Sequence, residues 1–439
     1  MAPLTFSVGT AIVDSRRRVN ACQATAAVFS SQGRAGVSTE GSFLGKDLRF
    51  TSCRQNKRRI VQKYFVVLNE LSLNGSSAPR KEVRRPVIVG VGGDSGCGKS
   101  TFTQRLADVF GAFDLSTGHT PVGEYLTSIC LDDYHLLDRQ GRKEAGVTAL
   151  NPVANNFDLM YEQIKALKNG EPIQKPIYNH KTGIIEGPET IYPNHVVIVE
   201  GLHPMYDERV RNLLDLSLYI DVDDHIKYAW KIKRDVNDRG HKVEDVLKEI
   251  EQRKPDFAAY VDPQKEQADI IMQILPTKLI PDDDQWQVLR VRLVQREGAK
   301  SFSPVYLIDE GSTFTWIPCG RKLTCTYPGI RFFYGPDVFA EHEVSILEMD
   351  GNFERVDELM YVEQFLKNTS AKYFGEMTQQ VLKNETLPGS RNGSGLMQVL
   401  VGFKLRRLWE KLNRTARFNL NPASLTSLDV DEPSALIGA

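Results

Sequence analysis

The chain has 439 residues, of which 41% are apolar and 25% charged, and its 55 basic and 56 acidic side chains leave a formal net charge of −1. This length accommodates two globular domains with flanking tails. The balanced charge gives no electrostatic case for nucleic acid binding, and no apolar run of about 18 residues is present to span a membrane. The sequence therefore predicts a soluble protein that binds neither nucleic acid nor a membrane.

Residues 1–80 differ in composition from the rest of the chain. Up to Lys63 the only acids are Asp14, Glu40 and Asp47, whereas arginine, lysine, serine, threonine and alanine are frequent. This composition is typical of an organelle transit peptide, and the apolar stretch near the start is too weak for a secretory signal. The alternative is a disordered extension that the mature protein retains. The sequence does not place a cleavage site.

The clearest motif lies in residues 87–101, where a β-branched apolar run ends in glycines and Gly-Lys-Ser. Between Gly93 and Ser100 it fills the pattern G-x-x-x-x-G-K-[ST], in which backbone N–H groups wrap phosphates, the lysine reaches the outer phosphoryl groups and the hydroxyl holds Mg²⁺. Apolar side chains at helical spacing follow, so the phosphates would lie on a helix N-terminus. The alternative is a simple glycine-rich turn. The predicted phosphate-binding residues are Gly93, Asp94, Ser95, Gly96, Cys97, Gly98, Lys99, Ser100 and Thr101.

Acidic residues follow two further strand-like runs. Asp132 and Asp133 come after residues 125–131, and Glu200 ends the run that begins at residue 196. Open α/β sheets bind ligands at the carboxyl ends of their strands. A carboxylate there can accept a proton from an attacking hydroxyl or orient a metal ion. The alternatives are a helix N-cap for the paired acids and a solvated strand end for Glu200.

Residues 225–239 follow a fourth strand-like run, 218–222, and are rich in cations. Basic helices are usually solvated faces. At this place in a kinase core, however, such a helix can form a lid that lays cations over the phosphates. The basic side chains are Lys227, Lys231, Lys233, Arg234 and Arg239.

The last third of the chain changes character. Residues 287–294 and 314–317 are rich in β-forming side chains, and helical spacing returns at 356–367 and 396–412. We therefore predict an α/β fold, with a P-loop kinase core whose mostly parallel central sheet is flanked by helices and extended by an antiparallel β region. The predicted segments are 81–284 for the core, 285–418 for the β extension and its helices, and 419–439 for a flexible tail.

The motifs occur in a characteristic order: GDSGCGKST, ICLDDYHLLDRQGRK, TALNPVANNFDLMYEQ, KPIYNHKTG, VIVEGLHPMYDERVR and WKIKRDVNDRGH. This order resembles the plant and algal type of phosphoribulokinase, from about Val87 to about Gly402. The resemblance implies a Calvin cycle enzyme of the chloroplast stroma. It would transfer the γ-phosphoryl group of ATP to the 1-hydroxyl of ribulose 5-phosphate, giving ribulose 1,5-bisphosphate and ADP.

The resemblance also implies roles for single residues. It makes Asp132 the general base, although the choice between Asp132 and Asp133 stays open. The catalytic residues that it implies are Asp132, Lys99, Lys231 and Arg234. The implied Mg²⁺ ligands are Ser100, Glu200 and Asp235. The residues implied to bind the sugar phosphate are His135, Arg139, Tyr178, His180 and Arg239.

Six cysteines are present, two of them within residues 1–80. The spacing of the others does not suit a metal site. The resemblance implies a regulatory disulfide between Cys97 and Cys130 that thioredoxin reduces, and a second between Cys319 and Cys325. At Cys97 the loop amides and the helix N-terminus favour a thiolate, which suits thiol exchange.

The resemblance further implies a homodimer, and an inactive complex with glyceraldehyde-3-phosphate dehydrogenase held by a small disordered linker protein. Two alternative functions remain. A uridine or pantothenate kinase of the same fold should lack the particular set of Arg139, Tyr178 and His180. A non-catalytic nucleotide-dependent assembly protein should have lost Lys99, Asp132 or Glu200, all of which are present.

Overall fold

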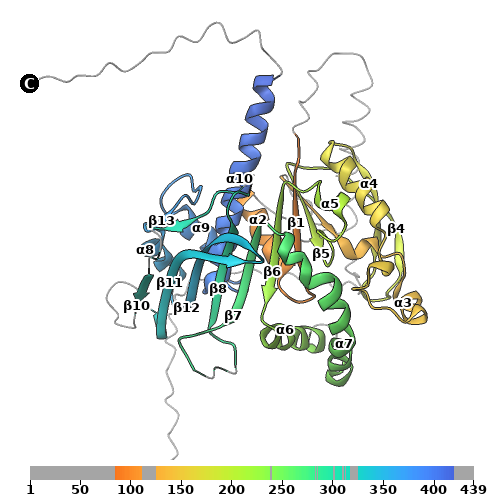
Figure 1. Ribbon diagram of the computed structural model, residues 1–439, viewed down its shortest axis with the longest axis horizontal. Helices are drawn as coiled ribbons and strands as arrows, with labels where there is room; N and C mark the ends of the chain where they lie inside the picture. Colours follow the sequence, from red (N-terminus) through yellow and green to blue (C-terminus); the bar gives the residue numbers. More distant parts are fainter. Residues whose placement is uncertain are drawn as a thin grey trace, which may run out of the picture. The chain divides into compact units, whose positions relative to one another are not determined.

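A nine-stranded sheet is the centre of the unit formed by residues Arg80–Ala439 (Figure 1). The computed structural model describes residues 85–110, 125–237, 240–281, 283, 285–299, 302–308, 311, 313–316 and 325–419. Several predictions fall outside the described residues: the transit peptide at 1–80, the tail beyond Asn419, Arg239, Cys319 and the side chain of Cys325.

Five strands of this sheet are parallel, and the order along the sheet is β10-β11-β12-β8-β7-β6-β1-β5-β2. Every residue of β1 is buried, as expected for a strand that helices cover on both faces. The parallel strands are β1 (Val87–Gly93), β2 (Leu126–Cys130), β5 (Val196–Gly201), β6 (Leu216–Val222) and β7 (Ile270–Pro276).

Four antiparallel strands continue the same sheet: β8 (Leu289–Arg296), β10 (Thr313–Trp316), β11 (Cys325–Phe339) and β12 (His342–Phe353). The predicted boundary between the core and the β extension, at residues 284 and 285, lies in the connection from β7 to β8. These two strands are hydrogen-bonded to each other. The parallel strands, the flanking helices and the antiparallel extension confirm the predicted fold class.

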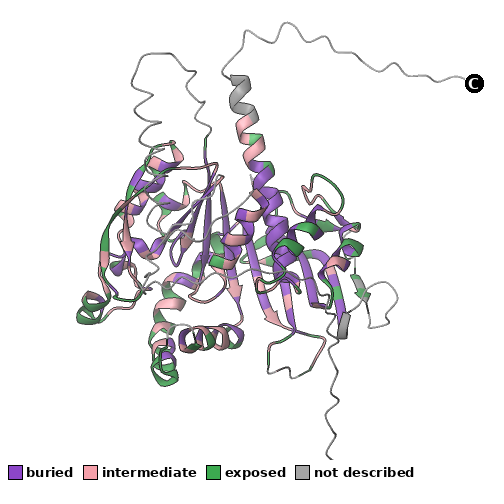
Figure 2. Ribbon diagram, turned by 180° about the vertical axis from the view of Figure 1, so that it is seen from behind, coloured by how far each residue is buried: buried purple, intermediate pink, exposed green. Residues whose placement is uncertain are grey.

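Helices cover both faces of the parallel strands. On one face α2 (Lys99–Phe110) packs under α10 (Gly393–Asn419), and a Cβ on Gly402 would lie 3.0 Å from Val109 Cγ2, so glycine allows the close approach. Figure 2 shows that the amino-terminal half of α10, which contains Gly402, is buried against the sheet. On the other face lies α4 (Phe157–Lys168), whose Ile164 and Leu167 pack into a second apolar cluster. The remaining helices are α3 (Arg139–Ala145), α5 (Glu208–Arg211), α6 (Asp224–Asn237), α7 (Val243–Asp256), α8 (Met360–Glu363) and α9 (Glu376–Lys383).

Two small sheets and several short turns complete the unit. The hairpin of β3 (Ile173–Tyr178) and β4 (Ile185–Ile191) forms its own sheet, as do β9 (Tyr306–Leu307) and β13 (Leu366–Lys367). The sequence predicted a helix at 356–367. The structure has a 3-10 turn, α8 and β13 there, so the prediction is correct only in part. The other short helices are η2 (Leu131–Tyr134), η3 (Pro152–Ala154), η4 (Phe257–Val261) and η5 (Asp262–Gln267).

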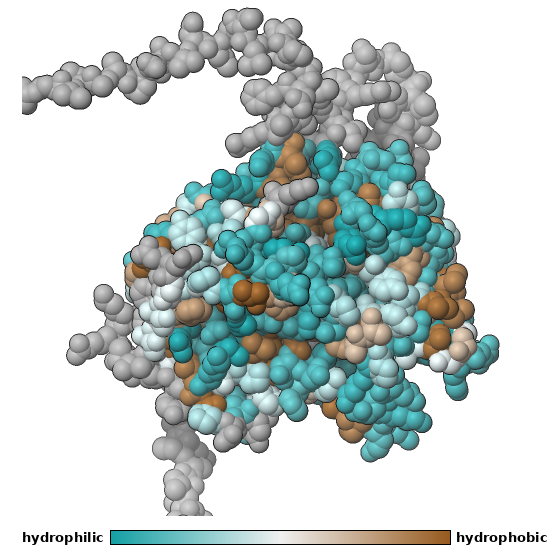
Figure 3. Space-filling view, viewed as in Figure 1, coloured by the Kyte–Doolittle hydropathy of each residue, from teal (hydrophilic) through white to brown (hydrophobic). Residues whose placement is uncertain are grey.

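The surface in the view of Figure 3 is mostly hydrophilic, with small and separate apolar patches. Exposed apolar side chains include Leu136, Val153 and Ile184. Among the described residues, no helix combines the length and the hydropathy that a membrane crossing requires.

Candidate active site

The carboxyl ends of β1, β5 and β2 bring the predicted functional segments to one edge of the sheet. In the parallel register, Glu200 of β5 pairs with Val91 of β1 on one side and with Cys130 of β2 on the other. Glu200 therefore lies between the loop that follows β1 and the acids that follow β2. This arrangement is the one that the strand-end acids predicted.

The loop between β1 and α2 has the backbone of a phosphate cradle. Gly93, Gly96 and Gly98 have φ angles of 145°, 88° and 92°, a region that favours glycine. A Cβ on Gly93 would lie only 2.7 Å from Ile220 O, so glycine is required there. Lys99 Nζ donates to two carbonyls of the loop at 2.9 and 2.7 Å, so its ammonium lies across the cradle.

The two neighbouring acids after β2 have different surroundings. Asp132 Oδ2 lies 3.7 Å from His180 Nε2. Burial by itself would raise the pKa of Asp132, but the positive charges of His135, His180 and Lys99 outweigh it and hold the pKa below its ordinary value. Asp133 instead is buried, and it accepts hydrogen bonds from Lys175 Nζ and, at 2.7 Å, from the backbone N–H of Tyr178. Burial raises the pKa of Asp133.

Two imidazoles flank the ring of Tyr178. The centroids of the His135 and His180 rings lie 5.0 and 5.1 Å from that of Tyr178, both edge-on. His135 is buried, its Nδ1 lies 3.0 Å from Asn155 Oδ1, and burial lowers its pKa. The Tyr178 hydroxyl accepts a hydrogen bond from Arg142 Nη2 at 2.8 Å. Arg142 was missed in the sequence, although its position three residues after Arg139 on one helix was an available signal.

Arg139 fixes the turn that carries His180. Its Nη2 donates to the carbonyl of His180 at 2.6 Å and its Nη1 to that of Lys181 at 3.3 Å. The backbone N–H of Arg139 donates to Gly183 O at 2.9 Å, and a Cβ on Gly183 would lie 2.6 Å from Arg139 Cβ. The guanidinium is therefore bonded to the hairpin turn in this structure.

Few groups of the protein offset the cost of burying the negative charge of Glu200. Thr103 Oγ1 lies 3.5 Å from its Oε2, and burial raises the pKa of Glu200 to about 7, although Lys99 opposes the shift. Ser100 stands exposed in the first turn of α2. A carboxylate and a hydroxyl are hard oxygen donors, which suit Mg²⁺ together with phosphate oxygens and water. The described residues contain no ready-made group of three or more histidine, cysteine or acidic ligands.

Asp235 does not fit the predicted role as a metal ligand. It is buried, and its two oxygens accept hydrogen bonds from Lys231 Nζ at 2.7 Å and Arg234 Nε at 2.8 Å. Burial opposes ionisation, but these two cations outweigh it and lower the pKa of Asp235 to about 2. Because both carboxylate oxygens bond cations, we infer that Asp235 positions Lys231 and Arg234.

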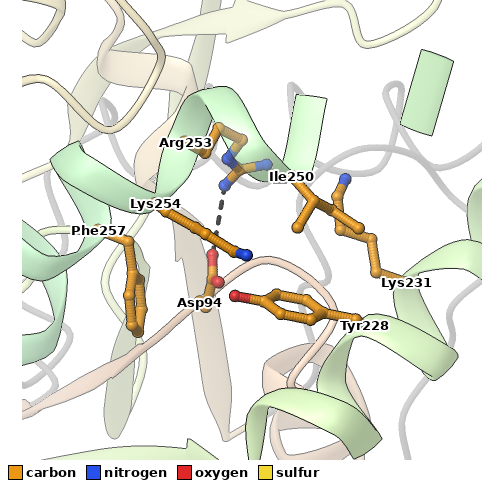
Figure 4. A pocket seen from close by; sticks show the side chains of 7 residues that line it. All are labelled: Asp94, Tyr228, Lys231, Ile250, Arg253, Lys254 and Phe257. Atoms are coloured by element: carbon orange, nitrogen blue, oxygen red, sulfur yellow. Dashed lines mark hydrogen bonds and ion pairs between the residues drawn. The ribbon is translucent and has the colours of Figure 1, made fainter. Parts of the chain in front are cut away.

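Charges of α6 and α7 close over the phosphate loop. Asp94 lies 3.3 Å from Arg253 Nη2 and 3.4 Å from Lys227 Nζ, and Glu249 bridges Arg253 and Lys231 at 3.1 and 3.3 Å. Figure 4 shows the Arg253–Asp94 contact in a pocket between the two helices. The spacing of Glu249 and Arg253 on α7 was the signal available in the sequence. The residues that line the pocket are Asp94, Tyr228, Lys231, Ile250, Arg253, Lys254 and Phe257.

Cys97 and Cys130 are both free thiols. The helix N-terminus led to the expectation of a thiolate at Cys97, and the structure overturns it: burial raises the pKa of Cys97 in spite of the nearby Lys99. Burial also raises the pKa of Cys130 well above its ordinary value. A Cβ on Gly93 would lie 2.8 Å from Cys97 Sγ, so this thiol sits at the end of β1, whereas Cys130 ends β2 beyond β5.

Comparison with known proteins gives consistent matches. The model of the "Phosphoribulokinase / Uridine kinase family" matches residues 88–281. A "Phosphoribulokinase, chloroplastic" of Mesembryanthemum crystallinum is 59% identical over 332 residues, which is 74% of this chain and 84% of the relative. A "Phosphoribulokinase" of Synechocystis sp. is 58% identical over 344 residues, 78% of this chain and 99% of the relative.

Among solved structures, a phosphoribulokinase from Rhodobacter spheroides matches with a TM-score of 0.37 and 17% sequence identity, over 51% of this chain and 88% of that chain. The two sequence matches, over 332 and 344 residues, extend well beyond the segment 88–281.

Proposed function

The chain belongs to the phosphoribulokinase family, and from that premise we propose that it transfers the γ-phosphoryl group of ATP to the 1-hydroxyl of ribulose 5-phosphate. The products are ribulose 1,5-bisphosphate and ADP. The observation that carries the proposal is the placement of an ionised carboxylate, Asp132, beside imidazoles at the same sheet edge as the phosphate loop.

Asp132 is the proposed general base. Its neighbour Asp133 is committed to Lys175 and to the backbone of Tyr178, whereas Asp132 faces His180. In a loose phosphoryl transfer the hydroxyl loses its proton late, so positioning contributes most of the rate and a high carboxylate pKa is not required. The proton of the 1-hydroxyl passes to Asp132 as the oxygen bonds to phosphorus.

The phosphate loop and α6 hold the transferring charge in this proposal. Loop amides and Lys99 bind the phosphates, and Lys231 and Arg234 lie above the loop. A Cβ on Gly96 would be 3.6 Å from Arg234 Nη1 and from Lys231 Cβ, so both side chains start close to the cradle. Fixed cations aimed at the phosphoryl group stabilise its charge in the transition state.

His135, Arg139, Tyr178 and His180 form the proposed sugar-phosphate side, to which the resemblance adds Arg239. For Tyr178 we propose a positioning role, because its hydroxyl is occupied by Arg142 and its ring separates the two imidazoles. Mg²⁺ would be held by Ser100 and Glu200 together with the phosphates. When bound, it neutralises phosphate charge during transfer.

Redox control through Cys97 and Cys130, with thioredoxin as reductant, is a further part of the proposal. Adjacent strands lie about 4.8 Å apart, so the ends of β1 and β2 are separated by about 10 Å with β5 between them. A disulfide needs Cα atoms within about 7 Å. Because Cys97 lies in the loop beyond the end of β1, a bond to Cys130 would tie the phosphate loop to the end of β2 and distort the ATP site. The pair Cys319 and Cys325 is proposed on the resemblance alone.

Location and assembly rest on the relatives and the resemblance. The plant relative named chloroplastic supports a chloroplast location, and we propose the stroma. A homodimer, and a complex with glyceraldehyde-3-phosphate dehydrogenase through a small disordered linker protein, stay predictions. The same holds for the segments 1–80, 81–284, 285–418 and 419–439.

ADP release by the full chain, measured with ribulose 5-phosphate, uridine and pantothenate as acceptors, tests the substrate. We expect ribulose 5-phosphate to be strongly preferred. Equal or faster turnover with uridine or pantothenate would contradict the assignment. The absence of ADP release with every acceptor would favour the nucleotide-dependent assembly protein.

A further inference from the structure

The hairpin that carries Tyr178 and His180 is joined to the acid segment by a buried cluster of three charges. Lys175 on β3 is fully buried, its Nζ donates to Asp133 Oδ2, and it lies 2.9 Å from Glu189 Oε1. Lys175 and Glu189 are cross-strand partners within the hairpin, whereas Asp133 belongs to η2. The cluster therefore connects two segments that no strand pairing joins.

Asp133 holds the hairpin at two points. One of its oxygens bonds Lys175 Nζ, and the other accepts from the backbone N–H of Tyr178 at 2.7 Å. Two attachments three residues apart fix both the position and the rotation of the end of β3. Because Asp132 directly precedes Asp133, these attachments, together with the bonds from Arg139 to the turn, set the distance of 3.7 Å between Asp132 Oδ2 and His180 Nε2.

A buried cluster of charges is not needed to stabilise the hairpin. Apolar side chains of similar volume usually stabilise a buried position at least as well as an ion pair, because burial of charge carries a desolvation penalty. The register between Lys175 and Ile177 shifts along the hairpin, an irregularity of the kind that redirects side chains beside active sites. The hydrogen bonds of Lys175 therefore favour one orientation of the hairpin over others.

We propose that Lys175, Asp133 and Glu189 are positioning residues that hold the β3–β4 hairpin as the sugar-binding element of the enzyme. The proposal rests on the function proposed above, which places the sugar phosphate beside Tyr178 and His180. The cluster acts through the hairpin and does not touch the reacting atoms. Its loss displaces His180 from Asp132 and leaves the phosphate loop unchanged.

Steady-state kinetics of the full chain separate this role from general support of the fold. In Lys175→Met we expect kcat/KM for ribulose 5-phosphate to fall about tenfold or more, since a misplacement of about 1 Å can cost on the order of a hundredfold. The KM for ATP should stay within about twofold of wild type. Glu189→Gln removes the outer partner only, and we expect a smaller loss in the same direction.

Lys168→Met is the matched control. Lys168 Nζ lies 3.4 Å from Asp215 Oδ1, and the backbone N–H of Asp215 bonds Ile88 at the amino end of β1, away from the site. The kinetics of both substrates should be unchanged in this variant. Thermal unfolding of all three variants identifies those that fold.

Lys175→Met leaves Asp133 buried without its cation and can fail to fold, in which case Glu189→Gln decides the question. Unchanged sugar kinetics in a folded variant of the cluster, or a joint rise of both KM values, would overturn the proposal. A wild-type chain that does not turn over ribulose 5-phosphate contradicts the proposed function and this inference with it. Wild-type turnover with unaffected variants contradicts the inference alone.

Discussion

The two sides of the candidate active site are built from charges of different exposure. On the phosphate side, Lys231 and Arg253 share Glu249, whose side chain is 45% exposed, although Lys231 also has a buried partner in Asp235. On the sugar side, Lys175 is fully buried against Asp133. Exposed pairs separate at little cost, whereas separation of a buried pair leaves an unpaired charge in the interior. We therefore expect Glu249 to release its cations when a nucleotide binds, whereas Lys175 and Asp133 stay paired.

The largest effect is expected at Asp132, where the two sides meet. Asp132→Asn removes the proposed base and an orienting charge, so kcat should fall by about 10²-fold or more while ATP binding is retained. Turnover with ribulose 5-phosphate and a separate measurement of ATP binding check this. Turnover close to that of wild type would show that another acid is the base.

Oxidation should act on the phosphate side. The proposed disulfide between Cys97 and Cys130 would constrain the phosphate loop, so we expect the oxidised wild type to lose most of its activity and a dithiol to restore it. Cys130→Ser should resist oxidation, and Cys325→Ser serves as the comparison variant. If oxidised Cys130→Ser is as inactive as oxidised wild type and a dithiol restores both, the inhibitory bond involves other cysteines.

Much of this site follows from local sequence, and the remainder depends on distant contacts. The phosphate loop and the strand-end acids were predictable because glycine spacing and apolar runs are local patterns. The partner of Asp133 was not, because Lys175 lies 42 residues away along the chain. The same limit applies at Cys97 and Asp235: burial of the thiol, and the two cations that bond the Asp235 oxygens, arise only when the chain folds.

Glu200 gives a pH-dependent prediction for the phosphate side. Its pKa is raised to about 7 from the ordinary 4.5, so the folded state binds more protons than the unfolded state between these values, and stability falls as pH rises from 4.5 to about 7. Glu200→Gln should therefore stabilise the Mg²⁺-free protein at pH 7.5 by about 1 to 3 kcal/mol.

The same variant should need more Mg²⁺ for half-maximal activity, because it lacks the carboxylate. Thermal unfolding at pH 5 and pH 7.5, together with a Mg²⁺ titration of activity, checks both effects. Equal stabilisation at the two pH values would show that the ionisation of Glu200 is not its source.

The smallest effect is expected from the exposed pairs over the phosphate loop. Glu249→Gln removes one carboxylate that competes with phosphate for Lys231 and Arg253, while Asp235 and Asp94 continue to position these cations. The KM for ATP should fall by about two- to fivefold, the range that corresponds to an exposed ion pair, and the KM for the sugar should not change. Glu244→Gln, near the start of the same helix, is the control. A rise in the KM for ATP would mean that Glu249 orients these cations productively.

The position of the new phosphoryl group on the sugar tests the central claim most directly. The full chain is incubated with ATP, Mg²⁺ and ribulose 5-phosphate, and the product is examined by ³¹P NMR. The two-sided site, with Asp132 at the acceptor hydroxyl, predicts ribulose 1,5-bisphosphate formed in step with ADP. Release of inorganic phosphate without a bisphosphate, or phosphorylation of any hydroxyl other than that at carbon 1, would contradict the account.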